Sequence, residues 1–85
     1  MKPEWEYVLN ETSLQFLLSC RSRDRGQLVD ALEKLTREPM QRGDWVAEDE
    51  TGRPIQIKRI GRFMVSFWAD SFVKELRLIK IERIE

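Results

Sequence analysis

The residue pattern of this 85-residue chain changes once, at Pro39, and this change constrains the fold more than any other feature. Before Pro39, Leu28, Leu32 and Leu35 recur at the three- and four-residue spacing of one helix face. After it, short β-branched and aromatic segments alternate with breaks that contain glycine. A proline ends a helix because its ring removes a backbone donor and clashes with the preceding turn. The sequence therefore predicts an α+β domain, helical first and then a sheet.

The N-terminal half predicts one strand and two helices. Residues 5–9 are aromatic and β-branched, which indicates a short strand. Asn10 is a favoured N-cap, so we expect the first helix to follow it and to end near Cys20. The Ser-Arg-Asp cluster at residues 22–24 predicts the N-cap of a second helix, which runs to Pro39.

The C-terminal half predicts an antiparallel sheet on which the N-terminal strand and the two helices pack. We expect its strands at residues 44–49, 55–60, 63–69 and 75–83. In the third strand, alternation predicts that Phe63, Val65 and Phe67 face the helices, whereas Met64, Ser66 and Trp68 face the other way.

The last predicted strand carries apolar residues on both faces, which is typical of a central strand. Strict alternation places Leu76 and Leu78 on one face and Ile79 and Ile81 on the other. Elsewhere, we expect Trp45 in the core or on a sheet face.

The residue types limit the chemistry that this chain can perform. It has no histidine and a single cysteine, Cys20, which excludes serine–histidine triads, internal disulfides and most zinc sites. Any catalysis must come from lysine, arginine, carboxylates or Tyr7, and we expect no metal and no cofactor. No apolar run approaches the roughly 20 residues that span a bilayer. We therefore expect one cytoplasmic domain over residues 1–85, with no membrane partner.

Charge is distributed unevenly along the chain, although its formal net value is zero. Residues 1–50 carry eleven acidic and seven basic side chains, whereas residues 51–85 carry four acidic and eight basic ones. The basic half can form one positive face, which is typical of a surface that binds phosphate groups. The plain alternative is a solvated surface of mixed charge.

Residues 55–70 and 76–83 together resemble the RelE/ParE superfamily of type II toxin–antitoxin toxins. The first stretch combines a basic strand, Gly61, an aromatic strand and an acidic turn; the second is a hydrophobic strand rich in arginine. Residues 32–39 match the end of the family's helix, so the resemblance covers nearly the whole chain. It implies the family's fold, a toxin that inhibits growth, and a cognate antitoxin as partner.

Members that depend on the ribosome cleave messenger RNA with lysine and arginine side chains, so the resemblance implies an mRNA endonuclease that inhibits translation. Matching positions makes Arg59, Arg62 and Arg83 the catalytic candidates. The candidates for nucleic-acid binding are Lys58, Arg59, Arg62 and Lys80. A ribosome carrying mRNA, or DNA gyrase, is then the implied target.

Two departures from the family pattern keep other interpretations open. Met64 occupies the position of the family's characteristic arginine, and the sequence ends without the terminal tyrosine or histidine. The alternative is a non-enzymatic member of the same fold, either a gyrase inhibitor or a non-toxic binding module. Met64 and Trp68 are the candidate antitoxin contacts, because they lie two strand steps apart on one face. A third option is an unrelated homodimer that pairs through a sheet edge.

Overall fold

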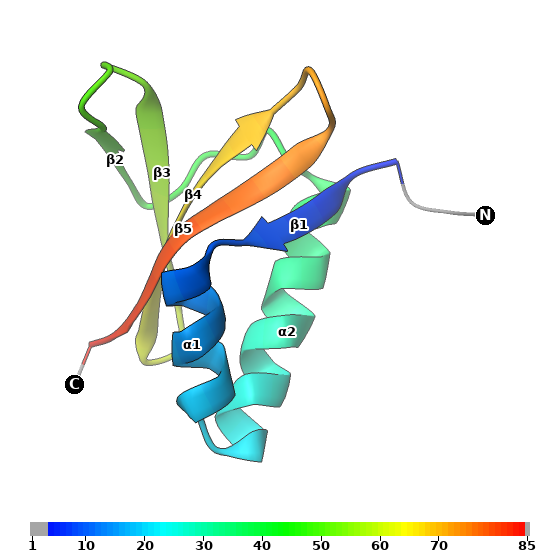
Figure 1. The fold of residues 1–85 in the computed structure, drawn as a ribbon, viewed down its shortest axis with the longest axis vertical. Helices are drawn as coiled ribbons and strands as arrows, with labels where there is room; N and C mark the ends of the chain where they lie inside the picture. The colour runs from blue at the N-terminus through cyan, green and yellow to red at the C-terminus, as the bar shows by residue number, and fades with distance from the viewer. Residues whose placement is uncertain (1–3, 85) are drawn as a thin grey trace.

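The computed structural model describes residues 4–84 and has two layers, a sheet and a pair of helices (Figure 1). Its elements, in chain order, are β1 (Glu6–Leu9), α1 (Glu11–Ser19), α2 (Ser22–Arg37), β2 (Trp45–Glu48), β3 (Pro54–Ile60), β4 (Phe63–Asp70) and β5 (Glu75–Arg83). The predicted α+β fold is confirmed, and each predicted strand lies within one residue of the observed bounds.

The five strands form one sheet in the order β1-β5-β4-β3-β2. Strands β2 to β5 pair with one another in antiparallel fashion, as predicted. The N-terminal strand β1 joins this sheet as a parallel partner of β5, so the sheet is mixed. Strand β5 therefore lies between two neighbours, which confirms the prediction of a central strand.

The core forms where α2 packs on the middle of the sheet. Leu28 and Leu32 are fully buried, and Leu35 nearly so, because the helical spacing of these residues places all three on one face. Phe63, Val65 and Phe67 meet them from β4 and are also buried, as alternation predicted. Residues Leu17 and Cys20 of the α1 region complete the same cluster.

Strand β5 departs from strict alternation. Ser66 pairs with Lys80 but the next residue, Phe67, pairs with Leu78, so Ile79 is an extra residue in the ladder. This β-bulge shifts the side-chain pattern by one position. Leu76, Leu78 and Ile81 are consequently all buried. The prediction that Ile81 lies on the opposite face from Leu76 and Leu78 is wrong for this reason.

Asn10 joins the first helix to that bulge. Its side-chain oxygen accepts a hydrogen bond from the backbone N–H of Ser13 at 2.8 Å, which confirms it as the N-cap of α1. Its side-chain nitrogen donates to the carbonyl oxygen of Ile79, also at 2.8 Å. One side chain therefore fixes both the start of α1 and its position against β5.

The second helix does not begin as predicted. Its N-cap is Arg21, which makes no side-chain capping bond, and Ser22 is already helical. The junction is held instead by Arg25, which donates to the backbone carbonyl oxygens of Leu17, Leu18 and Cys20 at 3.2, 3.3 and 2.7 Å. The last carbonyls of a helix lack intrahelical partners, and here only that of Leu17 also accepts a backbone N–H, from Cys20 at 3.2 Å, among the turn and cap bonds of residues 4–84. The Arg25 side chain thus holds the end of α1 against α2, in place of a side-chain cap at the start of α2.

The segment before β2 lies against the backbone of β3 without room for a side chain. A Cβ atom on Gly43 would lie 2.5 Å from the carbonyl oxygen of Ile57, and the Gly43 N–H donates to the side chain of Gln56 at 2.8 Å. Gly26, in α2, has no such neighbour within 4 Å. A close backbone contact therefore requires glycine at position 43, whereas position 26 has room for a side chain.

We expect Gly43→Ala to lower the free energy of unfolding by about 1–3 kcal/mol, because the new methyl group overlaps backbone atoms that cannot rotate away. The matched control is Gly26→Ala, which should raise it by about 0.5–1 kcal/mol because alanine favours a helix interior. Urea denaturation measures both changes. Equal effects of the two substitutions would contradict this account of Gly43.

The turn between β2 and β3 is organised by Asp49. Its carboxylate accepts hydrogen bonds from the Thr51 hydroxyl at 2.7 Å and from the backbone N–H groups of Thr51 and Arg53 at 2.9 and 3.0 Å. These hydrogen bonds, chiefly the one from the Thr51 hydroxyl, favour the ionised carboxylate. They lower the pKa of Asp49 below its ordinary value of 3.8.

This shift predicts how stability depends on pH. The folded state favours the ionised carboxylate of Asp49, so its contribution is complete above the ordinary pKa of 3.8 and is lost as the pH falls through the lowered folded value. Asp49→Asn should therefore unfold at a lower temperature than the original protein at pH 7, and the difference should shrink between pH 4 and pH 2. Glu50→Gln is the control in the same turn. A difference independent of pH would contradict the role of the charge.

Candidate functional site

Adjacent residues of β3 point to opposite faces of the sheet, which separates the predicted cations. Lys58 pairs with Val65 and lines a hollow beside α2 that also contains Lys34 and Glu38. Arg59 pairs with Met64 on the other side. We call that side the open face; its central residues are Arg59, Met64, Ser66, Trp68 and Lys80.

Arg59 and Arg62 lie together at the β3–β4 turn. Gly61 supplies the positive φ of 61° that this turn needs, and its carbonyl oxygen accepts from Arg59 Nε at 3.0 Å. The Arg59 backbone N–H donates to Asp44 at 2.8 Å, a contact that the sequence did not reveal. Both arginines are exposed, and neither forms an ion pair with any residue of 4–84.

Arg83 reaches the same end of the sheet from the helix side. It pairs with Phe63 across the strands, and its guanidinium carbon lies 5.0 Å from the centre of the Phe63 ring. An Nη atom of Arg83 lies 3.7 Å from the carboxylate of Asp24, in the first turn of α2. The three catalytic candidates thus share one end of the sheet but come from two faces, and Arg83 already has an acidic partner.

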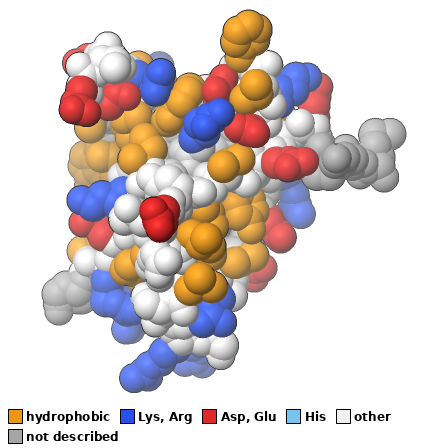
Figure 2. Space-filling model, in the orientation of Figure 1, with side chains coloured by type: hydrophobic (Ala, Val, Ile, Leu, Met, Phe, Trp, Pro, Cys, Tyr) orange, Lys and Arg blue, Asp and Glu red, His pale blue; other side chains and the backbone are white. Residues whose placement is uncertain are grey.

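This end of the molecule is visibly basic. In Figure 2, lysine and arginine side chains predominate at the lower end, where Figure 1 places the β3–β4 turn, the end of β5 and the connection between the helices. The backbone N–H of Ile84 donates to the carbonyl oxygen of Arg62 at 2.7 Å, which holds the end of the chain beside the turn. The basic end is therefore assembled from segments far apart in the sequence.

Lys80 lies further along the open face and has a local partner. It pairs with Ser66 across the strands, and its ammonium lies 3.6 Å from the carboxylate of Glu82. Glu82 in turn pairs with Met64, so Arg59, Met64 and Glu82 form one row across β3, β4 and β5. A methionine thus occupies the middle of this row.

Trp68, one of the two predicted antitoxin contacts, lies beneath the chain's own arginines. The guanidinium carbon of Arg53 is 3.9 Å from its ring centre and that of Arg77 is 5.7 Å away. Arg77 is held by Asp70 at 3.3 Å and Glu75 at 2.9 Å. Both Met64 and Trp68 are half-buried on the open face, four residues and thus two strand steps apart along β4.

The remaining sequence candidates lie elsewhere. Tyr7 pairs with Leu76 on the helix side of the sheet, so its phenol does not join the cations of the open face. Burial and, secondarily, the carboxylate of Glu33 raise its pKa above the ordinary 10.0. Trp45 lies on the edge strand β2 with 52% of its surface exposed, so it belongs to a sheet face and not to the core.

Two kinds of feature are absent from residues 4–84, a cluster of metal ligands and a membrane-spanning helix. No group of three or more histidine, cysteine or acidic side chains in this part of the chain is placed to hold a metal ion. No helix formed by these residues is long and apolar enough to cross a membrane.

Solved structures share this arrangement over nearly the whole chain. A chain of the toxin–antitoxin complex RelBE2 from Mycobacterium tuberculosis has a TM-score of 0.78 at 16% identity, covering 94% of this chain and 98% of that one. A chain of the archaeal RelE–RelB complex from Pyrococcus horikoshii OT3 has a TM-score of 0.75 at 14% identity, covering 95% and 96%. A chain of the intact E. coli RelBE toxin–antitoxin complex has a TM-score of 0.63 at 12% identity, covering 95% and 98%.

No protein-family model and no curated protein matches the sequence. The similarity therefore lies in the shape, and it confirms the fold that the resemblance of residues 55–83 implied. Two helices cover one face of a mixed sheet and leave the other face open. This chain has the RelE fold.

Proposed function

We propose that this chain is the toxin of a two-component toxin–antitoxin pair and that a cognate antitoxin is its partner. The observation that carries the proposal is a shared fold over 94–95% of the chain with proteins solved as toxin–antitoxin complexes. The basic end of the open face, with Arg59 and Arg62, supports it because such a surface suits an anionic target.

Within this proposal, Arg59 and Arg62 form the anion-binding pair. Both guanidinium groups are exposed at one turn, and neither is neutralised by a residue of 4–84. Closely placed arginines bind a phosphate group better than isolated ones because they act on the same charge. Lys80 extends the positive surface along the open face, whereas Lys58 does so only on the helix side.

The more specific proposal is a ribosome-dependent mRNA endonuclease. In it, Arg59 and Arg62 stabilise charge on the scissile phosphate, while another group accepts the proton of the attacking hydroxyl. Two carboxylates are candidates for that group: Asp44 accepts the Arg59 backbone N–H, and Glu82 lies in the same cross-strand row, beyond Met64. Arg83 would contribute after release from Asp24.

One observation favours the second candidate, a non-enzymatic member of the fold that inhibits gyrase or only binds a partner. Met64, an apolar side chain without a proton to transfer, lies between Arg59 and Glu82 in the row that would face the substrate. With Met64 at this position, the open face can bind an anion through Arg59, but the neighbouring side chain in the row cannot donate or accept a proton.

We expect expression of the chain alone in a bacterial host to stop growth and protein synthesis. Arg59→Ala combined with Arg62→Ala should restore both, and should slow mRNA cleavage in vitro by about 100-fold or more, because charge stabilisation at the phosphate is lost. Growth curves and separate labelling of protein and DNA measure the effect. The matched control is Lys34→Ala with Arg37→Ala, which removes the same charge from exposed positions in the last turn of α2.

The other outcomes separate the candidates. A collapse of DNA synthesis alone would support gyrase inhibition and contradict the nuclease. Unchanged growth, with the protein detected at full length in the cells, would contradict toxicity and leave the non-toxic binding module. Loss of activity in the control pair would show that total charge, and not the β3–β4 turn, determines the effect.

A further inference from the structure

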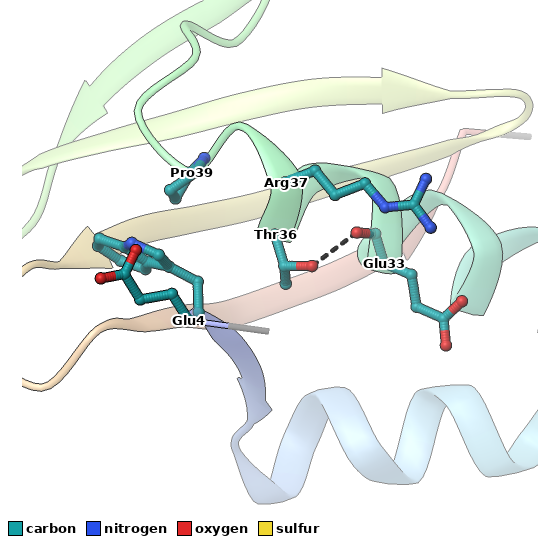
Figure 3. A pocket seen from close by; sticks show the side chains of 6 residues that line it. Glu4, Glu33, Thr36, Arg37 and Pro39 are labelled. Carbon is teal, nitrogen blue, oxygen red and sulfur yellow. Dashed lines mark hydrogen bonds between the residues drawn. The ribbon is translucent and has the colours of Figure 1, made fainter. Parts of the chain in front are cut away.

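The three tryptophans of the chain lie in different surroundings, and the first borders a hollow of mixed charge. Trp5 lines a hollow of about 700 Å³ between the segment that leads into β1 and the C-terminal half of α2 (Figure 3). Glu33 and Arg37, which also line it, are one helical turn apart, and Glu4 pairs with Lys74. The charges of this hollow therefore do not select a ligand of either sign.

Trp45 is the tryptophan that the chain itself leaves uncovered. Two arginines of the chain lie over the ring of Trp68, and Trp5 is half-buried. By contrast, 52% of the surface of Trp45 is exposed. A flat ligand that covers this ring removes apolar surface from water on both partners, which favours binding.

The register of the sheet places Trp45 on the open face, diagonal to Arg59. Trp45 pairs with Ile57, which in turn pairs with Ser66 of the open face. Arg59 lies two residues further along β3 and therefore on the same face as Ile57. Diagonal neighbours on adjacent strands are about 7–8 Å apart, within reach of aromatic and long side chains. An exposed indole and an arginine thus share one corner of the open face.

The charge of this corner favours an anionic ligand. Arg59 and Arg62 form no ion pair with any residue of 4–84. The ammonium of Lys80 lies 3.6 Å from the carboxylate of Glu82, so these two charges offset each other. Asp44 is the remaining carboxylate, and it accepts the backbone N–H of Arg59 at 2.8 Å. Two arginines therefore outnumber one carboxylate.

We propose that this corner binds single-stranded nucleic acid, with a phosphate group at Arg59 and Arg62 and a neighbouring base stacked on Trp45. A nucleotide combines an anionic phosphate with a flat aromatic base, which are the groups that arginine and an exposed indole bind. A single strand is the expected ligand because its bases are free to stack on a side chain, whereas those of a duplex stack on each other.

This inference rests on the anion-binding role of Arg59 and Arg62 in the proposed function and adds a base contact to it. Every base has a flat face, so stacking on Trp45 tolerates many sequences. The contact therefore positions a strand on the open face and does not by itself choose a sequence.

The test is an NMR titration of the full chain with a single-stranded hexanucleotide whose 2′-hydroxyl groups are methylated, so that it cannot be cleaved. We expect a saturable shift of the Trp45 indole N–H, with the Trp5 indole unchanged. Trp45→Ala should weaken binding by about 10-fold, the loss of one base stack, and Trp45→Phe should retain most of the affinity. The matched control is Val46→Ala, an exposed apolar residue on the opposite face of the same strand, which should leave the affinity unchanged.

An oligonucleotide of the same length without bases separates the two contacts. It keeps every phosphate group, so the original chain and Trp45→Ala should bind it equally and weakly. Arg59→Ala combined with Arg62→Ala should weaken the binding of both oligonucleotides. It should also lower the dependence of affinity on salt, because fewer counterions are released.

Several results would overturn the proposal. These are the absence of a saturable Trp45 shift at millimolar oligonucleotide, equal affinity of Trp45→Ala and the original chain for the strand with bases, and equally tight binding of a duplex of the same sequence. Binding that needs Arg59 and Arg62 but not Trp45 would overturn the base contact and leave the proposed function standing. Growth arrest by a chain that binds no oligonucleotide would do the same and would assign Trp45 to a protein contact. Circular dichroism confirms that each variant is folded.

Discussion

The packing of α2 on β4 is the contact on which the rest of the structure depends. Leu28, Leu32 and Leu35 cover Phe63, Val65 and Phe67, and all of these are buried. Because side chains alternate along a strand, burying this face leaves the other face of β4 open. One hydrophobic contact thus decides both where the core lies and which side chains can meet a partner.

The elements of the fold were predictable because their signals are local. Helical leucine spacing, the alternation along β4 and the proline after α2 each act within a few residues, and the structure confirms these three predictions. The bulge at Ile79 had no such signal, since it depends on how β5 pairs with β4 and on the bond from Asn10, 69 positions earlier. A single extra residue then moved Ile81 into the core.

The candidate site was predictable in composition but not in geometry. The sequence shows Lys58, Arg59 and Arg62 as one basic cluster, yet strand alternation separates Lys58 from Arg59. The pairing of Arg83 with Asp24 joins residues from β5 and α2, and Arg53 reaches Trp68 from a turn. Such contacts form only after the sheet has assembled, so no local pattern indicates them.

The formal net charge of zero conceals a difference between the two ends of β4. One end carries Arg59 and Arg62, which form no ion pair with residues 4–84, whereas at the other end Lys74 pairs with Glu4 and Arg77 pairs with Asp70 and Glu75. Strand β4 has eight residues, which at ~3.3 Å each separate these ends by about 26 Å. That distance exceeds the screening length of about 8 Å at physiological salt. The attraction of Arg59 and Arg62 for an anion is therefore set by the residues around the β3–β4 turn, and the ion pairs at the other end of the strand have little effect on it.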